Sequence, residues 1–241
     1  MSTALGDELG RGVSSRVYAW GDGRVVKVFE PEFASLAPTE AERAAAVHRA
    51  GVPSPAVHGS VDVDGRVGIV FDRLDGPSAM REPGAGELVA RLHVAVHDVD
   101  VGAADGLPQL ADTLSGMGAP GLRAGHAVFH GDFHPGNVMR HRGTWTVIDW
   151  SNAHLAPPAA DVACSVLAIG FRGLRDDHPD AARHHRRRLR VADEYLATYR
   201  ALRPSAVEDL LVWTTVIGRL LLEREPAIAY ADELRARWIA D

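Results

Sequence analysis

The chain has 241 residues, of which 46% are hydrophobic and 24% are charged, a balance typical of a globular protein with one large domain or two lobes. Its formal net charge of −6 argues against a nucleic-acid-binding protein, because such proteins neutralise phosphates with Lys and Arg. The single cysteine, Cys164, excludes an internal disulfide and favours a reducing compartment.

The distribution of apolar residues along the chain also bears on the cellular compartment of the protein. The first residues lack the basic start and the apolar stretch of a signal peptide. No uninterrupted apolar run approaches the roughly 18–20 residues that a membrane span needs. We therefore expect a cytoplasmic protein with neither a nucleic acid nor a membrane as partner, and the sequence leaves its oligomeric state open. The frequent use of Ala, Arg, Gly and Val is typical of a GC-rich bacterial genome.

The first third of the chain has the pattern of two β-hairpins. Short apolar runs rich in valine flank turns in which glycine follows aspartate, and such Asp-Gly pairs are typical of tight hairpins. The predicted strands cover residues 9–20, 24–29, 57–63 and 66–71.

A helix is predicted between the two hairpins, from about Thr39 to Ala50. Thr39 and Glu42 have the spacing of a capping box, in which two side chains satisfy free amides of the first turn, and Gly51 marks the end. After the second hairpin, the run 73–77 interrupts the pattern with Gly and Pro and is the predicted hinge between two lobes.

Helices dominate beyond this hinge, apart from one short hairpin. The pattern predicts an α+β fold with a strand-rich lobe of residues 1–74 and a helical lobe of residues 75–241. Helical periodicity covers 87–96, 161–169, 186–202 and 207–222, and the hairpin has strands at 137–140 and 144–150.

Three polar residues stand out around this hairpin: Asp132, Asn137 and Asp149. Asp149 follows a strongly apolar strand, where a carboxylate costs desolvation unless a cation compensates it. Mg²⁺ fits, because it takes oxygen ligands and is held by one or two carboxylates together with substrate phosphates. Asn137 would add a neutral oxygen ligand, and Asp132 would remain free to accept a proton from an attacking hydroxyl.

Two motifs occur here in order, His-Gly-Asp at 130–132 with Asn137, and Ile-Asp-Trp at 148–150. Together they resemble the signature of the aminoglycoside phosphotransferases and their kinase-like relatives, and they parallel two motifs of protein kinases. Gly131 and Trp150 depart from the protein-kinase form and agree with the small-molecule form. The resemblance covers about residues 9–165. It implies a protein-kinase-like fold, with a small antiparallel sheet and one helix in the first lobe and a larger helical second lobe.

The resemblance extends to the segment 9–18, which is similar to the glycine-rich strand–turn–strand that covers the nucleotide phosphates. Gly10 and Gly12 permit close approach of the backbone to a nucleotide. Ser14 and Ser15 stand where protein kinases often have a third glycine, and their hydroxyls and backbone N–H groups are available for phosphate.

Lys27 is the only lysine of the chain and lies in an apolar strand, so it needs a partner. The resemblance assigns Lys27 to the α- and β-phosphates and implies a glutamate partner on the following helix. Glu40 and Glu42 both qualify. We favour Glu40 from its distance to the Gly-Val-Pro segment at 51–53, while Glu42 has an alternative use in the capping box.

The resemblance also implies supporting residues. Arg73 and Leu74 belong to the strand and hinge whose backbone pairs with adenine. His130 is interpreted as a scaffold residue. Asp161 is expected to anchor the catalytic loop from the following helix, with a plain helix N-cap as the alternative. Two histidines on a patterned helix are interpreted as structural: His93 and His97.

We therefore expect an ATP- and Mg²⁺-dependent phosphotransferase that moves the γ-phosphate to a hydroxyl of a small molecule, such as an aminoglycoside-like compound, a sugar or an amino alcohol. Acidic residues of the helical tail are offset by at least as many arginines, so a polycationic acceptor is not favoured over a neutral one. The choice between ATP and GTP stays open.

Two other functions remain as alternatives. A protein kinase is disfavoured by the compact hairpin and by the lack of an Ala-Pro-Glu-like segment. A non-catalytic nucleotide-binding regulatory module is disfavoured because every residue with an implied catalytic, phosphate or metal role is present.

Overall fold

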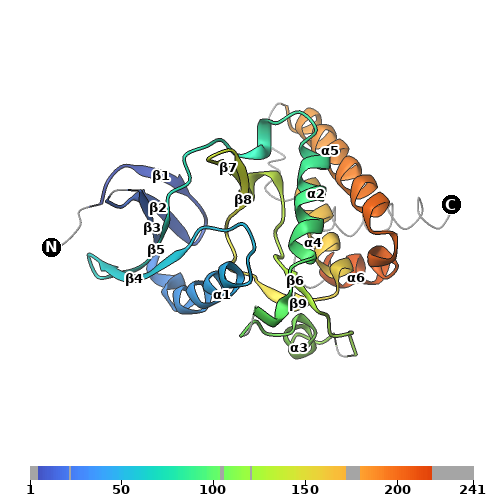
Figure 1. Cartoon of the computed structure of the whole chain (residues 1–241), viewed down its shortest axis with the longest axis horizontal. Coiled ribbons are helices and arrows are strands. Elements are labelled where there is room, and N and C mark those ends of the chain that lie inside the picture. The colour runs from blue at the N-terminus through green and yellow to red at the C-terminus, as the bar shows by residue number, and fades with distance from the viewer. Residues whose placement is uncertain (1–4, 22, 104–105, 120, 172–179, 219–241) are drawn as a thin grey trace.

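Five antiparallel strands and one long helix form the first lobe (Figure 1). The computed structural model describes residues 5–21, 23–103, 106–119, 121–171 and 180–218. The sheet has the order β1-β2-β3-β5-β4, which places β3 in its centre. Its strands are β1 (Glu8–Arg11), β2 (Ser15–Ala19), β3 (Arg24–Phe29), β4 (Val57–Val63) and β5 (Arg66–Asp72).

The central strand β3 alternates between the two faces of the sheet, as expected for a strand with side chains of period two. Val26 and Val28 are buried in an apolar cluster on one face. Phe29 packs with Ala37 of the helix α1 on the other face. Lys27 shares that second face, so its ammonium group points toward the same helix.

The helix α1 (Ala37–Arg49) begins two residues earlier than predicted. Its N-cap is Leu36, which makes no side-chain capping bond, and Thr39 is already the third helical residue. The predicted capping box of Thr39 and Glu42 is therefore wrong. Pro38 is tolerated in the first turn, where no intrahelical amide bond is lost, and so it does not delay the start of the helix.

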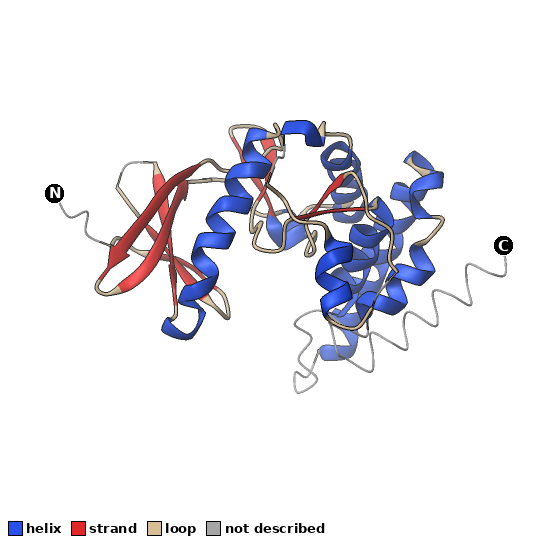
Figure 2. Cartoon of the chain, turned by 90° about the horizontal axis from the view of Figure 1, so that it is seen from below, coloured by secondary structure: helices blue, strands red, loops and turns tan. Residues whose placement is uncertain are grey.

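Four helices build most of the second lobe: α2 (Ala85–His97), α4 (Pro158–Phe171), α5 (Ala181–Leu202) and α6 (Leu210–Ile217). Figure 2 shows these helices and the first lobe's sheet at opposite ends of the molecule. The helix α4 is the centre of this lobe, because all of its residues from Ala159 to Phe171 are buried. Cys164 lies within it, and burial raises the pKa of its thiol well above the usual value.

The remaining elements are short. They are α3 (Leu110–Gly116), the strand pair β6 (Ala127–Phe129) with β9 (His154–Ala156), and the hairpin of β7 (Val138–His141) with β8 (Thr144–Val147). The helices α4 and α5 were predicted too short, since they begin three and five residues before the predicted starts. The predicted helix over 207–222 is instead a 3-10 turn (Pro204–Val207) followed by α6, and residues 219–222 lie outside the described residues.

The two lobes are joined along the segment that follows β5. The backbone N–H of Arg140 in β7 donates to the carbonyl of Pro77 over 2.9 Å. Gly76 lies so close to the carbonyl of Arg140 that a Cβ could not be accommodated there. In a second crossing, the N–H of Val147 donates to the carbonyl of Pro53 over 2.7 Å. The predicted hinge is thus packed against the hairpin of the second lobe.

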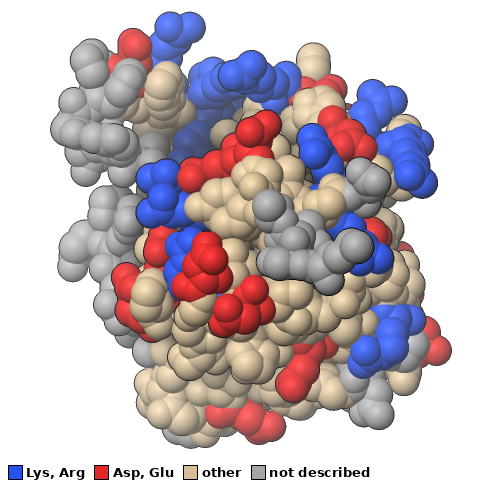
Figure 3. Space-filling view, turned by 90° about the vertical axis from the view of Figure 1, so that its left-hand side faces the viewer, with Lys and Arg blue, Asp and Glu red and all other residues tan. Residues whose placement is uncertain are grey.

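The surface of the first lobe carries charges of both signs, which are interspersed in Figure 3. Two ion pairs illustrate this: Arg11 with Glu8 within β1, at 2.9 Å, and Arg16 of β2 with Glu30 just after β3, at 2.8 Å. None of the helices in the described part of the chain combines the length and the apolarity that crossing a bilayer takes.

Candidate active site

The loop of residues 130–137, which we call the catalytic loop, connects β6 to β7 and is fixed by a buried carboxylate. Asp161 in α4 accepts the backbone N–H of His130 over 2.6 Å and that of Gly131 over 2.9 Å. Asp161 is the fourth residue of its helix, so the alternative role as an N-cap is wrong. Gly131 has φ of 77°, and a Cβ at this position would lie 2.7 Å from the ring of Phe129. Glycine is therefore required here by the fold.

His130 is fully buried and connects the two conspicuous acidic segments. Its Nδ1 accepts the backbone N–H of Asp132 over 3.1 Å, so in the neutral ring Nε2 carries the hydrogen. That Nε2–H donates to the carbonyl of Ile148 over 3.0 Å. Burial lowers the pKa of His130, which keeps the ring in this neutral form.

Asp132 is 6% exposed and lies close to two other side chains of the loop. Asn137 Nδ2 donates to the carbonyl of Asp132 over 3.1 Å and lies 3.4 Å from Asp132 Oδ2. His134 Nδ1 accepts the N–H of Gly136 over 2.9 Å, and its Nε2 lies 3.6 Å from Asp132 Oδ2. Burial, and then the charge of Arg188, lower the pKa of His134 to about 4.

Asn137 was predicted in a strand, and this is wrong. It ends the 3-10 turn Pro135–Asn137, and β7 begins at the next residue. The tighter turn leaves the Asn137 side chain near Asp132, while its carbonyl accepts the N–H of Ile148 over 2.9 Å. The catalytic loop and the segment before Asp149 are thereby held side by side.

Asp149 follows β8, which ends at Val147 and not at residue 150 as predicted. Asp149 has φ of 64°, a left-handed conformation that costs a non-glycine residue roughly 1–2 kcal/mol. Its Oδ1 accepts from Lys27 Nζ over 3.1 Å and from the hydroxyl of Ser151 over 3.2 Å. Burial alone would raise the pKa of Asp149, but Lys27 outweighs it and the pKa lies below the usual value.

Lys27 pairs with Glu40, and not with the alternative partner Glu42. Its Nζ lies 2.6 Å from Glu40 Oε1, and both side chains are largely buried. Glu42 is exposed on the same helix. Burial alone would lower the pKa of Lys27, but Asp149 and Glu40 together raise it above the usual value. The ammonium group is thus charged and shared between a helix of the first lobe and a loop of the second.

The glycine-rich segment forms the turn between β1 and β2. The N–H of Gly12 donates to the carbonyl of Ser15 over 2.9 Å, and the N–H of Glu30 donates to the carbonyl of Ser14 over 2.9 Å. A Cβ on Gly10 or Gly12 would meet no atom closer than 3.6 Å, and neither residue has a positive φ. The fold itself therefore does not require glycine at these two positions.

The hinge residues lie where β5 leaves the first lobe. The N–H of Arg73 donates to the carbonyl of Gly23 over 2.9 Å, and its guanidinium pairs with Asp75 at 3.1 Å. Leu74 is partly buried beside it. Both residues line the connection between the lobes.

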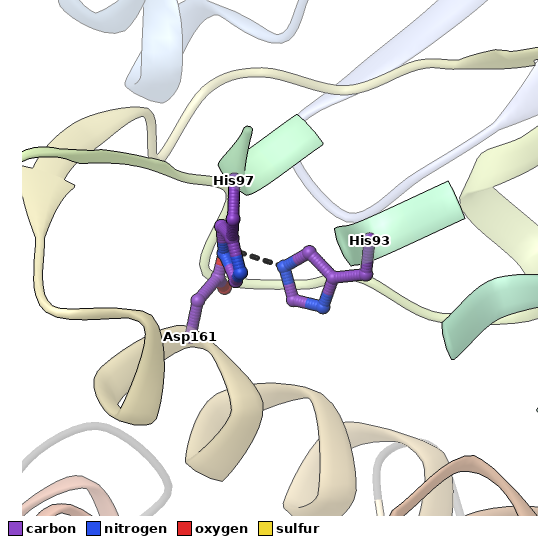
Figure 4. Close-up of side chains that lie close together, drawn as sticks. All are labelled: His93, His97 and Asp161. Atoms are coloured by element: carbon purple, nitrogen blue, oxygen red, sulfur yellow. Dashed lines mark hydrogen bonds and ion pairs between the residues drawn. The ribbon is translucent and has the colours of Figure 1, made fainter. Parts of the chain in front are cut away.

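Several contacts of this site were not predicted. Arg43 of α1 donates from Nη1 to the carbonyl of Ser151 over 2.6 Å, which ties the helix of Glu40 to the loop of Asp149. His93 and His97 of α2 both contact Asp161 (Figure 4). Their partners on α5, Tyr195 and Tyr199, belong to a long amphipathic helix in which tyrosines at i and i+4 read simply as core residues.

Comparisons with known proteins identify a family and a shared fold. A model of the phosphotransferase enzyme family matches residues 7–120 and 107–205 of the chain. No curated protein matches it significantly.

Solved structures share the fold at low identity. An aminoglycoside-3'-phosphotransferase of type VIII is 18% identical, with a TM-score of 0.61, and the match covers 91% of this chain and 93% of the other. A thermostable mutant of the aminoglycoside phosphotransferase APH(4)-Ia, in a ternary complex with ADP and hygromycin B, is 16% identical, with a TM-score of 0.60 and 95% and 91% covered. A choline/ethanolamine kinase family protein from Mesorhizobium loti is 20% identical, with a TM-score of 0.57 and 98% and 87% covered.

Proposed function

This chain belongs to the phosphotransferase enzyme family, and from that membership we propose that it transfers the γ-phosphate of ATP, in the presence of Mg²⁺, to a hydroxyl group of a small molecule. The observation that carries the proposal is the convergence of three remote segments. Lys27 of β3 reaches both Glu40 of α1 and Asp149 of the second lobe. Asp149 is in turn linked to Asp132 through Ile148 and His130.

The proposed nucleotide site lies between the glycine-rich turn and this cluster. The fold does not require glycine at positions 10 and 12. The lack of a side chain at Gly10 and Gly12 would instead leave room for a ligand to approach the backbone closely. Ser14 and Ser15 would donate to phosphate oxygens, Lys27 would bind the α- and β-phosphates, and the backbone of Arg73 and Leu74 would pair with adenine. Two solved structures with this fold hold ADP or AMP-PNP together with hygromycin B, which supports a nucleotide in the same place.

The oxygen atoms of Asn137 and Asp149 fit a magnesium ion. Asn137 donates from Nδ2 to Asp132, which leaves Oδ1 as a ligand atom, and Asp149 uses Oδ1 for Lys27 and Ser151. Among the hydrogen bonds of the described residues, none uses Asn137 Oδ1 or Asp149 Oδ2. Such a pair of oxygen donors suits Mg²⁺, which would neutralise charge on the phosphate oxygens.

The chain's own residues then carry the transfer. Asp132 accepts the proton of the acceptor hydroxyl, and the hydroxyl oxygen forms a bond to the γ-phosphorus. The bond between the γ-phosphorus and the bridging oxygen breaks, and ADP leaves with that oxygen. His130 and Asp161 hold the backbone N–H groups that lead up to this carboxylate, those of residues 130–132. We also propose a cytoplasmic location and a division into a nucleotide lobe, residues 1–74, and a catalytic and acceptor-binding lobe, residues 75–241.

A panel of acceptors tests this function. Protein, ATP and Mg²⁺ are incubated with hygromycin B, choline, ethanolamine, a fructosamine and simple sugars, compounds suggested by the names of the structural neighbours. ADP release is followed by a coupled assay, and each acceptor is examined by mass spectrometry for an added phosphate. We expect one class to be phosphorylated, with Asp132→Asn lowering turnover by roughly 10²–10⁴-fold. Unchanged turnover in Asp132→Asn would contradict the assigned base. Nucleotide binding without transfer to any acceptor would favour a binding module.

A further inference from the structure

A buried polar group lies where α2, α4 and α5 meet, behind the catalytic loop. Asp161 is 1% exposed and His93 is fully buried. Besides the amides of His130 and Gly131, Asp161 Oδ2 accepts from His93 Nε2 over 2.9 Å and from His97 Nε2 over 3.4 Å (Figure 4). A buried carboxylate therefore has four donors, two from the catalytic loop and two from α2.

Each histidine continues to a tyrosine of α5. Tyr195 Oη lies 2.7 Å from His93 Nδ1, and Tyr199 Oη lies 2.6 Å from His97 Nδ1. Because a carboxylate only accepts, each Nε2 carries the hydrogen that it donates to Asp161. Each Nδ1 of a neutral ring is then an acceptor, and the tyrosine hydroxyl donates to it. Two parallel chains thus run from hydroxyl to imidazole to carboxylate.

The protonation of the first chain agrees with this direction. Burial lowers the pKa of His93 to about 4, so its ring is neutral at physiological pH. Burial also raises the pKa of Tyr195 well above its usual value, so its hydroxyl keeps its hydrogen. The ring of His93 stacks on Phe133, the residue after Asp132, with 4.0 Å between ring centroids. His93 therefore contacts the catalytic loop directly as well as through Asp161.

His93, His97 and Asp161 have the composition of a metal site. The hydrogen bonds argue against an ion there, because both Nε2 atoms and both carboxylate oxygens already have partners, and the histidines and the aspartate are buried. A cation would have to displace hydrogen bonds that satisfy every one of these atoms. The group is complete as a hydrogen-bonded network.

We propose that Tyr195 and Tyr199 are positioning residues for the catalytic loop and act through His93, His97 and Asp161. The inference rests on the proposed function, since the loop matters for transfer only if Asp132 is the base. Asp161 holds the backbone amides of His130 and Gly131, the two residues before Asp132, and the two histidines fix the orientation of its carboxylate. The helix α5 is thereby part of the support of the site, although its two tyrosines lie about 60 residues beyond that loop in the sequence.

Removing one hydroxyl tests this without changing the packing of the rings. Tyr195→Phe and Tyr199→Phe each break one chain at its outer end. The control is Thr198→Val, which removes the hydroxyl of a partly buried residue from the same helix without touching either chain. The first readout is hydrogen–deuterium exchange of the peptide over 127–133, with the β3 peptide as internal reference. The second readout is a pair of kinetic parameters, kcat and the KM for ATP, both measured well below the unfolding temperature.

We expect faster exchange of the His130 and Gly131 amides in both variants, with kcat lowered roughly 10- to 100-fold and the KM for ATP within twofold of wild type. Thr198→Val should change neither readout. A lower Tm with unchanged exchange and unchanged kcat would overturn the inference, because the tyrosines would then only stabilise the helix packing. A wild-type protein without turnover would contradict the proposed function alone, and the exchange result would still decide the inference.

Discussion

His130 donates from Nε2 to the carbonyl oxygen of Ile148 over 3.0 Å and thereby ties the catalytic loop to the residue before Asp149. Its Nδ1 accepts the N–H of Asp132 at the same time. One fully buried ring thus fixes the spacing between the proposed base and the proposed metal ligand.

Replacing this ring should affect stability and activity together. His130→Ala leaves a cavity and two buried backbone groups without their partners, which we expect to lower the free energy of unfolding by about 2–4 kcal/mol. Urea denaturation measures this, with His126→Ala as a control at an exposed histidine. Equal loss in the two variants would show that the bonds to Asp132 and Ile148 contribute nothing.

The two candidate glutamates of α1 can be separated by matched substitutions. Glu40→Gln removes the charge that lies 2.6 Å from Lys27, whereas Glu42→Gln alters an exposed position on the same helix. We expect Glu40→Gln to raise the KM for ATP about tenfold, because Lys27 loses the partner that orients it toward the phosphates. Steady-state kinetics with varied ATP checks this. Equal KM values in the two variants would remove Glu40 from the site.

Substitutions of Gly12 and Gly131 separate a glycine that a ligand requires from a glycine that the fold requires. Gly12→Ala should leave Tm nearly unchanged, since a Cβ there meets only ordinary contacts, but should weaken nucleotide binding. Gly131→Ala should lower Tm by several degrees, because φ is 77° and the Cβ would collide with Phe129. Thermal unfolding with and without nucleotide measures both effects. A Gly12→Ala protein that binds nucleotide like wild type would contradict the proposed phosphate contact.

Stability should fall in mild acid because of His93. Its pKa is about 4 in the folded chain and about 6.5 when unfolded, so the unfolded state binds more protons between these values. The contribution of His93 is complete above pH 6.5 and is lost as pH falls toward 4. The free energy of unfolding therefore falls by about 2 kcal/mol between pH 6.5 and pH 5.

Denaturant unfolding over this pH range measures the slope for wild type and variants. His93→Gln keeps a donor for Asp161 but cannot titrate, so we expect a shallower slope, while the exposed His126→Gln should behave like wild type. A slope that is identical in His93→Gln would assign the acid sensitivity to other groups.

Structural features that depend on residues close together in the sequence were predicted well. The Asp-Gly turns indicated the hairpins β2–β3 and β4–β5, and the two acidic motifs indicated the family. The single strand predicted over 9–20 is wrong, because the glycine-rich turn divides it into β1 and β2. The choice of Glu40 over Glu42 came from that resemblance, and the structure pairs Glu40 with Lys27. The roles of these residues in binding and catalysis remain predictions.

The errors arose where distant contacts decide the local structure. Asn137 reads as part of an apolar strand, but its bonds to Asp132 and Ile148 hold it in a turn. Thr39 has the spacing of a cap, yet the preceding 3-10 turn Pro31–Leu36 lets the helix begin at Ala37. The contacts of the α5 tyrosines with His93 and His97 could not be predicted, because about 100 residues of sequence separate each tyrosine from its histidine.

The most direct test of the central claim is a thermal-shift titration with ATP and Mg²⁺ on wild type, Asp149→Asn and Asp64→Asn. Asp64 is the matched control, since it is also an exposed aspartate with positive φ, 51°, but lies in the turn between β4 and β5 and outside the proposed site. Asparagine tolerates this conformation, so both variants lose a charge without a change of backbone. We predict that Tm rises with ligand by mass action in wild type and in Asp64→Asn, and much less in Asp149→Asn. No rise in wild type at millimolar nucleotide, or an equal rise in all three proteins, would contradict the account.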